Sequence, residues 1–272
     1  MGTAIITGAS AGIGAVFARR LAERGHDLVL VARRADRLQE LADRLDTRVE
    51  VLVADVADAG DLSRVAERAA GEDVALLVNN AGINGYGPFA EIDPAVLMGV
   101  LAVNVTAPAV LARAALPGML ARGEGTIVNV ASLLAFAASL PPGPLPIRAT
   151  YAGTKGFMVT WSRTLAAELA DTPVRVQVLC PGYTATEFHM TTGTDPVQGE
   201  APQDQPFAMS AEDVVQASLV AMDTGEVVCA PGVQDPEAFE RLAAAEAAVR
   251  GGDRRPRLAD RYRQEPPGVT SR

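Results

Sequence analysis

The chain has 272 residues, of which 49% are hydrophobic and 21% charged, the balance of an ordinary globular protein. Its 33 acidic and 24 basic residues give a net charge of −9, which argues against nucleic-acid binding because that function needs a basic face. Two cysteines exclude a disulfide framework, and with only two histidines we expect no metal site. No apolar run approaches the length of a membrane span and no basic flank marks a signal peptide, so we expect a cytoplasmic protein without a membrane partner.

Short apolar runs alternate with stretches of helical periodicity. The runs are continuous rather than alternating, which is typical of parallel strands buried on both faces. The expected strands are residues 3–7, 27–32, 48–54, 75–78, 125–130, 175–179 and 227–230. The expected helices between them are residues 12–24, 34–45, 60–70, 96–122, 151–170 and 211–223. This alternation predicts an α/β fold with one domain, a doubly wound, Rossmann-like parallel sheet of about seven strands.

The predicted domain covers residues 1–250 and has a substrate loop at about 186–209. Two segments interrupt the alternation: prolines at 141, 142, 144 and 146 exclude a helix or central strand, and residues 191–207 are expected to form a mobile loop. The sequence predicts a terminal helix over residues 236–249, which begins after the capping residue Asp235. The Arg-rich tail 251–272 is expected to be flexible.

A glycine-rich turn, Gly8-Ala9-Ser10-Ala11-Gly12-Ile13-Gly14, joins the first strand to the first helix. Glycines allow a tight turn and a close approach to a pyrophosphate, whose charge is favoured by a helix N-terminus. The spacing is GxxxGxG rather than the commoner GxGxxG, and a plain tight turn is the alternative. Its place between a strand and a helix favours a dinucleotide site.

The second strand ends without the carboxylate that would bind the ribose hydroxyl of NAD. Arg33 and Arg34 stand there instead, and guanidinium groups can bind a 2′-phosphate in a bidentate manner. The alternative, two solvated residues that open the next helix, is less favourable because cations oppose the helix dipole there. These residues predict NADP rather than NAD.

Tyr151 and Lys155 lie four residues apart in a helical stretch and so share one face. A tyrosine with its usual pKa of about 10 exchanges protons poorly near neutrality. A nearby ammonium is expected to lower that pKa toward the working pH.

Together these motifs resemble the short-chain dehydrogenase/reductase family. The matching residues run in family order over residues 3 to about 230: Thr7-Gly8 through Gly14, Asp55-Val56, Asn79-Asn80-Ala81-Gly82, Asn104, Ser132, Tyr151 with Lys155, and Pro181-Gly182 with Thr186. Two departures are the absence of a basic residue at Ala11 and a long interval between Ser132 and Tyr151.

The resemblance implies a role for each of four catalytic residues. Tyr151 would be the general acid in carbonyl reduction, or the base in the reverse direction, and Ser132 would hydrogen-bond the carbonyl oxygen. Lys155 would hold the nicotinamide ribose and lower the pKa of Tyr151. Asn104 would hold a water that links Lys155 to solvent.

The resemblance also implies the cofactor contacts. Asp55 would meet the adenine amino group, residues 80–82 would lie along the adenosine ribose, and residues 181–186 would cover the nicotinamide. The full expected set is Gly8, Ser10, Gly12, Ile13, Gly14, Arg33, Arg34, Asp55, Val56, Asn80, Ala81, Gly82, Tyr151, Lys155, Pro181, Gly182, Thr184 and Thr186.

These features predict an NADP-dependent oxidoreductase that interconverts a carbonyl compound and an alcohol. Two alternatives stay open: a catalytically silent NADP(H)-binding regulatory protein, and a non-redox reaction on the same scaffold. The residues expected near Ser132 and Tyr151 are mainly apolar, which suits a small neutral hydrophobic substrate. The long helices carry small apolar side chains, which suit a homodimer or homotetramer.

Overall fold

The computed structural model describes residues 2–141, 148–192, 195–196 and 208–251, together with Leu258 and Tyr262. Most of the proline-rich segment, of the expected loop 191–207 and of the tail 251–272 therefore lies outside the described residues. By its internal contacts the chain forms two compact units, Met1–Gly232 and Val233–Arg272. The sequence places the end of the domain near residue 250, whereas the first compact unit ends at Gly232.

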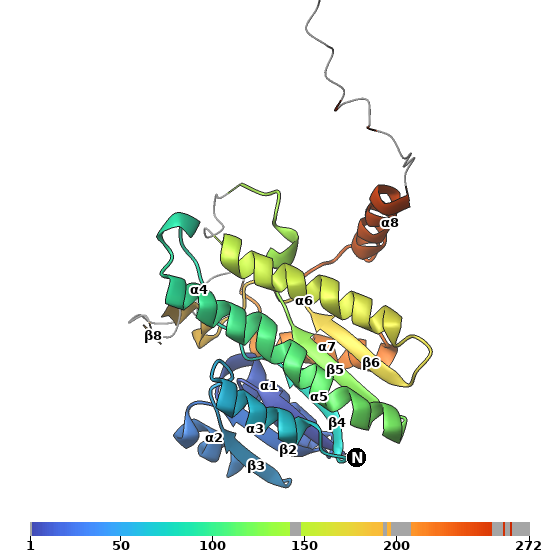
Figure 1. Ribbon diagram of the computed structural model, residues 1–272. Helices are drawn as coiled ribbons and strands as arrows, with labels where there is room; N and C mark the ends of the chain where they lie inside the picture. Colours follow the sequence, from blue (N-terminus) through green and yellow to red (C-terminus); the bar gives the residue numbers. More distant parts are fainter. Residues whose placement is uncertain are drawn as a thin grey trace, which may run out of the picture. The chain divides into compact units, whose positions relative to one another are not determined.

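The first unit is built on a seven-stranded parallel sheet (Figure 1). Its strands are β1 (Thr3–Thr7), β2 (Asp27–Ala32), β3 (Val49–Val53), β4 (Val74–Asn79), β5 (Gly125–Val130), β6 (Val174–Leu179) and β9 (Val228–Cys229), in the order β3-β2-β1-β4-β5-β6-β9. The prediction of a doubly wound, Rossmann-like parallel sheet is confirmed. The sequence did not predict β7 (Thr191–Thr192) and β8 (Asp195–Pro196), which form a separate antiparallel pair.

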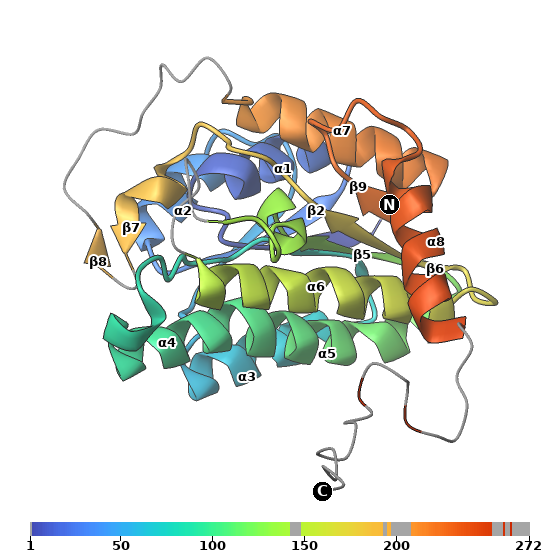
Figure 2. The same ribbon diagram turned by 90° about the horizontal axis from the view of Figure 1, so that it is seen from above.

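Helices cover both faces of the sheet (Figure 2). One face carries α1 (Gly12–Glu23), α2 (Ala35–Ala42) and α7 (Ala211–Thr224), and the other carries α3 (Ala59–Ala69), α4 (Pro94–Leu101), α5 (Ala107–Arg122) and α6 (Ala149–Glu168). Successive strand residues point to opposite faces, so Ile6 joins the core under α1 while Ile5 joins the core under α5. Three short 3-10 turns complete the unit: η1 (Phe89–Glu91), η3 (Leu133–Phe136) and η4 (Glu187–Met190).

The predicted helix 96–122 corresponds to α4 and α5, which a π-helical turn, η2 (Ala102–Thr106), joins into one helical stretch. In an unbroken α-helix the carbonyl of Asn104 would accept from the N–H four residues later. That residue is Pro108, which has no N–H to donate. Such π-turns are frequent at functional sites.

Within the described part of the chain, Pro94–Arg122 is also long and apolar enough to cross a membrane by length and composition alone. The expectation that no run reaches that length is therefore wrong here. In the fold this stretch lies in the helical layer over the sheet, and α5 buries Leu111, Ala115 and Met119. The cytoplasmic location stays a prediction.

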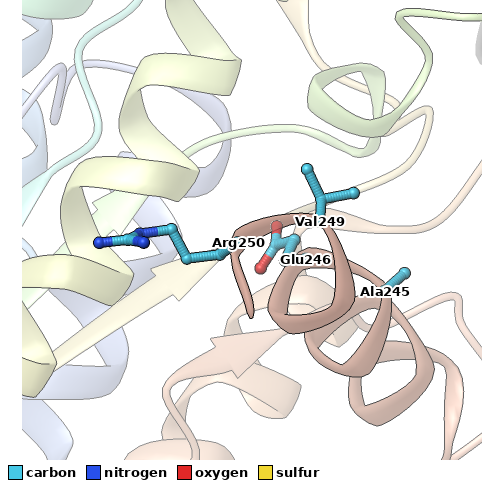
Figure 3. Close-up of a pocket in the computed structure, with 4 residues that line it drawn as sticks. All are labelled: Ala245, Glu246, Val249 and Arg250. Atoms are coloured by element: carbon cyan, nitrogen blue, oxygen red, sulfur yellow. The ribbon is translucent and has the colours of Figure 1, made fainter. Parts of the chain in front are cut away.

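The second unit contains α8 (Ala238–Gly251), close to the predicted helix 236–249. Asp235 accepts from the backbone N–H of Glu237 and pairs with Arg241, so it stabilises the start of this helix. A hollow on the surface of α8 is lined by Ala245, Glu246, Val249 and Arg250 (Figure 3). None of these four residues is among the predicted site residues.

Candidate active site

The predicted motifs follow strands that are neighbours in the sheet. β1, β4, β5 and β6 are adjacent and parallel, so their carboxyl ends meet at one edge. The order of the chain reverses between β1 and β4, the switch point at which open α/β sheets bind ligands. Gly8 and Asn80 come directly after β1 and β4, and Ser132 and Pro181 are the second residues after β5 and β6.

The glycine turn has backbone conformations that only glycine adopts easily. Gly8 has φ of 67° and Gly12 has φ of 53°. A Cβ on Gly8 would lie 2.8 Å from Asn80 Nδ2 and 2.9 Å from Ala81 Cα. The turn is thus a bare backbone cradle that leads into α1 at Gly12, Ile13 and Gly14, and it fits the pyrophosphate of a dinucleotide.

Thr7 fixes the glycine turn to the Asn80–Gly82 turn. Its hydroxyl accepts from the backbone N–H groups of Asn80 and Ala81, each at 3.0 Å. Asn80 Nδ2 donates back to the Thr7 carbonyl at 2.9 Å. The two predicted cofactor-binding turns therefore form one hydrogen-bonded body.

The segment expected to cover the nicotinamide lies beside the same turn. A Cβ on Gly12 would meet Thr186 Cγ2 at 3.0 Å. The Pro181 carbonyl accepts from the N–H of Leu133 at 2.9 Å, and Thr184 donates to the Gly182 carbonyl at 3.2 Å. This segment thus connects the cofactor cradle with the residues after β5.

Arginines gather at the outer end of the glycine turn. Arg34 Nη2 donates to Ser10 Oγ at 2.9 Å, and Arg33 Nη1 lies 3.7 Å from Asp55 Oδ2. The sequence did not single out Arg37, although it stands one helical turn after Arg34. Nη1 of Arg34 and Nη1 of Arg37 both donate to the Glu187 carboxylate, at 2.9 and 2.8 Å.

Asp55 is held by its neighbours at the end of β3. Its N–H donates to Asp61 Oδ2 at 2.8 Å, and its Oδ1 accepts from the N–H of Ala57 at 3.0 Å. Val56 is buried, whereas the Asp55 side chain is partly exposed. The Asp55 carboxylate is thus presented at the carboxyl edge of the sheet.

Tyr151 and Lys155 share one face of α6, as their spacing predicts. Both are buried, with exposures of 5% and 3%. The Ser132 side chain is close enough to Tyr151 to oppose the rise in its pKa, and Ser132 Oγ accepts from the N–H of Leu134 at 3.1 Å. Lys155 Nζ lies 5.6 Å from the Tyr151 ring centroid and donates to the Val130 carbonyl at 2.8 Å.

Asn104 is fixed in the π-turn by three hydrogen bonds. It accepts from the N–H of Ile83 at 3.0 Å and donates to the Ile83 carbonyl at 2.9 Å and to Thr154 Oγ1 at 3.1 Å. Thr154 donates in turn to the Tyr151 carbonyl at 2.8 Å. No role for Thr154 was predicted from the sequence, in which its position three residues after Tyr151 was the available signal.

Burial controls the pKa values at this site. It raises the pKa of Tyr151 well above the usual value, with a further rise from Tyr86, although the Ser132 hydrogen bond opposes the shift. The same desolvation lowers the pKa of Lys155 to about 8. The expected lowering of the Tyr151 pKa by Lys155 is therefore wrong, because burial outweighs it and leaves Tyr151 a proton-bearing phenol.

Aromatic rings surround the Tyr151 ring. Tyr86 meets it edge-on with centroids 5.3 Å apart, and Phe188 lies at 5.7 Å. Burial and the neighbouring Tyr183 raise the pKa of Tyr86 to about 12. The side of Tyr151 that these rings cover is therefore apolar.

A family model described as short chain dehydrogenase matches residues 2–196. The chain belongs to the short-chain dehydrogenase/reductase family. This result confirms the resemblance inferred from the order of the motifs. Membership supports oxidoreductase chemistry at the edge where these motifs meet.

Two curated members of the family illustrate its range. The chain is 39% identical over 187 residues to galactitol 2-dehydrogenase (L-tagatose-forming) from Cereibacter sphaeroides, an alignment that covers 68% of this chain and 72% of that protein. It is 31% identical over 192 residues to inactive hydroxysteroid dehydrogenase-like protein 1 from Homo sapiens, which covers 68% of this chain and 56% of that protein.

Solved structures of family members match nearly the whole chain. A short-chain dehydrogenase from Sphingobium yanoikuyae in complex with NADPH has a TM-score of 0.88 and 35% identity, over 97% of this chain and all of that one. The bulky-bulky ketone specific alcohol dehydrogenase from Comamonas testosteroni has a TM-score of 0.84 and 31% identity, over 96% of this chain and 98% of that one.

Proposed function

We propose that the chain is an NADP-dependent carbonyl reductase, or an alcohol dehydrogenase in the reverse direction. The observation that carries the proposal is that Tyr151 and Ser132 interact at the carboxyl edge of the sheet and that Tyr151, Lys155 and Asn104 are buried there. The bound cofactor would supply the hydride. Tyr151 would donate a proton to the carbonyl oxygen of the substrate, and Ser132 would hydrogen-bond that oxygen.

The raised pKa of Tyr151 suits the reductive direction. A protonated phenol can donate its proton to the carbonyl oxygen as charge develops there, while Ser132 stabilises that charge by a hydrogen bond. Lys155 Nζ and Asn104 Oδ1 both lie beside Gly82, so the groups proposed to resupply the proton stand together.

Two observations support NADP as the cofactor. Arg34 is fixed against Ser10 of the glycine turn, where a 2′-phosphate on the adenosine ribose would come within reach of guanidinium groups. The Sphingobium yanoikuyae structure, which matches almost the full length, contains NADPH.

The proposed substrate is a small, neutral, hydrophobic ketone or aldehyde. The rings of Tyr86 and Phe188 beside Tyr151 support an apolar contact next to one polar focus. Nη2 of the buried Arg148 donates to the backbone carbonyls of Ala137 and Leu140. This nitrogen is therefore bonded within the protein and is not directed at an anionic substrate. The name of the Comamonas testosteroni enzyme, bulky-bulky ketone specific, agrees with a ketone substrate but favours a larger one than the small carbonyl compound expected from the sequence.

The test is a steady-state assay of NADPH oxidation with apolar ketones and aldehydes. L-tagatose serves as the polar substrate for comparison. We expect the highest kcat/KM with an apolar carbonyl. A higher value with L-tagatose would contradict the proposed substrate class but leave the reaction class intact. The absence of hydride transfer with every compound would contradict the reaction class.

A catalytically silent protein is the second candidate, because the human relative is named inactive. A non-redox reaction is the third. Tight NADPH binding without turnover would favour the silent protein, and product formation without stoichiometric NADPH consumption would favour the non-redox reaction. The joint presence of Asn104, Ser132, Tyr151 and Lys155 favours the oxidoreductase.

A further inference from the structure

The Glu187 carboxylate occupies the basic corner beside the glycine turn. It accepts from Arg37 Nη1 at 2.8 Å with both of its oxygens and from Arg34 Nη1 at 2.9 Å. These hydrogen bonds hold the pKa of Glu187 below its usual value, so the group is an anion at neutral pH. Ser10 borders the same corner, because Arg34 Nη2 donates to its Oγ at 2.9 Å.

Glu187 belongs to η4, which directly follows Thr186 in the segment that covers the cofactor cradle. The carboxylate therefore connects the substrate side of the site to α2 on the adenosine side. Asn84 Nδ2, which donates to the Phe188 carbonyl at 3.3 Å, holds the same turn from the opposite side.

We infer that Glu187 competes with the 2′-phosphate for Arg34 and Arg37, and so determines how strongly the enzyme prefers NADP(H) to NAD(H). The inference rests on the proposed NADP binding. A carboxylate and a phosphate are both oxygen anions that guanidinium groups bind in the same geometry, so the two cannot share the same donors.

The local charge agrees with an exchange of one anion for the other. Arg34 and Arg37 share the single carboxylate of Glu187, which leaves this cluster with one net positive charge while Glu187 is present. Its departure would leave two, the charge that balances a phosphate dianion. A ligand with a 2′-hydroxyl instead would leave Glu187 in place.

The side chains at this corner are nearly half exposed, so the ion pairs are individually weak. Exposed pairs contribute up to about 1 kcal/mol each, so loss of the competitor should tighten phosphate binding about 3- to 20-fold. A change of that size is readily measured.

The test uses Glu187→Gln, which removes the charge but keeps the size of the side chain. Calorimetric titrations with adenosine 2′,5′-bisphosphate and with 5′-AMP isolate the contribution of the 2′-phosphate to binding, since the two ligands differ only in that group. We expect about 3- to 20-fold tighter binding of the bisphosphate and less than about twofold change for 5′-AMP. The ratio of kcat/KM for NADPH over NADH should rise by a similar factor.

The matched control is Glu212→Gln, which removes an exposed carboxylate paired with Arg19 on α1 and changes the net charge equally. Glu212→Gln should leave the affinities for adenosine 2′,5′-bisphosphate and for 5′-AMP unchanged. Equal or weaker binding of the bisphosphate by Glu187→Gln would overturn the inference, as would equal tightening of both ligands. If the unaltered protein bound both ligands equally, the NADP assignment would fail as well, so the two failures are distinguishable.

Discussion

Lys155 Nζ donates a hydrogen bond to the carbonyl oxygen of Val130, the last residue of β5, at 2.8 Å. This bond ties α6 to the strand that leads to Ser132, so the lysine that we propose to be catalytic is also part of the packing between helix and sheet. Lys155 is the only lysine in the chain. Its titration can therefore be observed without interference from other lysines.

A single-site titration should give a pKa of about 8 for Lys155, because burial disfavours the ammonium. The measurement is an NMR pH titration of the protein labelled with ¹³C at lysine Cε, in which one signal is expected. A midpoint near the usual value of about 10.4 would mean that the side chain is solvated, and would contradict the buried site.

The lowered pKa has a consequence for stability. Between about pH 8 and pH 10.5 the unfolded chain keeps the Lys155 proton that the folded protein has lost, so this group makes the free energy of unfolding rise with pH. Lys155→Met removes that contribution. We expect the difference in unfolding free energy, wild type minus variant, to grow by on the order of 3 kcal/mol over this range. A constant difference in urea titrations would contradict the assignment.

Removal of the Tyr151 hydroxyl should abolish turnover and leave cofactor binding intact. Tyr151→Phe keeps the ring between Tyr86 and Phe188 but loses the transferable proton and the hydroxyl that interacts with Ser132. Loss of one general acid costs roughly 100-fold or more in kcat. The measurements are kcat and the Kd for NADPH. Near-normal turnover would contradict the role of Tyr151.

The strands and most helices could be predicted from sequence because they depend on local patterns. Continuous apolar runs marked the buried parallel strands, and each predicted strand lies within two residues of an observed one. The π-helical turn at Asn104 was not predicted, because the apolar periodicity continues across it. Pro108, four residues on, was the signal that could have located the turn.

The candidate site was predictable where motifs follow strand ends, and not where distant residues meet. Glu187 lies 150 residues from Arg37, and no local pattern pairs them. The protonation of Tyr151 was mispredicted for a similar reason. The spacing reveals a nearby ammonium, but it does not reveal the burial that outweighs it.

Arg34→Gln should reduce the preference for NADPH over NADH. The change removes the charge and the fork of donors that Arg34 directs toward Ser10 and Glu187. A charge-assisted hydrogen bond to an anion contributes about 1.5–3 kcal/mol, so we expect roughly a 10- to 100-fold fall in kcat/KM for NADPH and little change for NADH. Equal losses with both cofactors would place the 2′-phosphate elsewhere.

The Thr154 hydroxyl should position Asn104. Thr154→Val keeps the shape of the buried side chain but leaves the Asn104 amide without one acceptor, which costs about 1–3 kcal/mol of folding free energy. Because Asn104 is proposed to support proton resupply, kcat should fall while the KM for NADPH changes little. Thr154→Ser keeps the hydroxyl and should restore kcat. Loss of stability without any effect on kcat would limit Thr154 to a structural role.

The helical layer formed by α4, α5 and α6 should mediate self-association. Large apolar side chains are exposed there, namely Met98, Leu101, Val110, Leu120 and Phe157, and Phe157 stacks on Trp161 with ring planes 13° apart. Exposed apolar side chains on neighbouring helices suit a symmetric contact between copies. Light scattering should give two or four times the 28.3 kDa of one chain. Phe157→Glu should lower that mass, whereas Val220→Glu, an exposed position on α7 across the sheet, should not. A mass of 28.3 kDa for the unaltered protein at micromolar concentration would contradict the prediction.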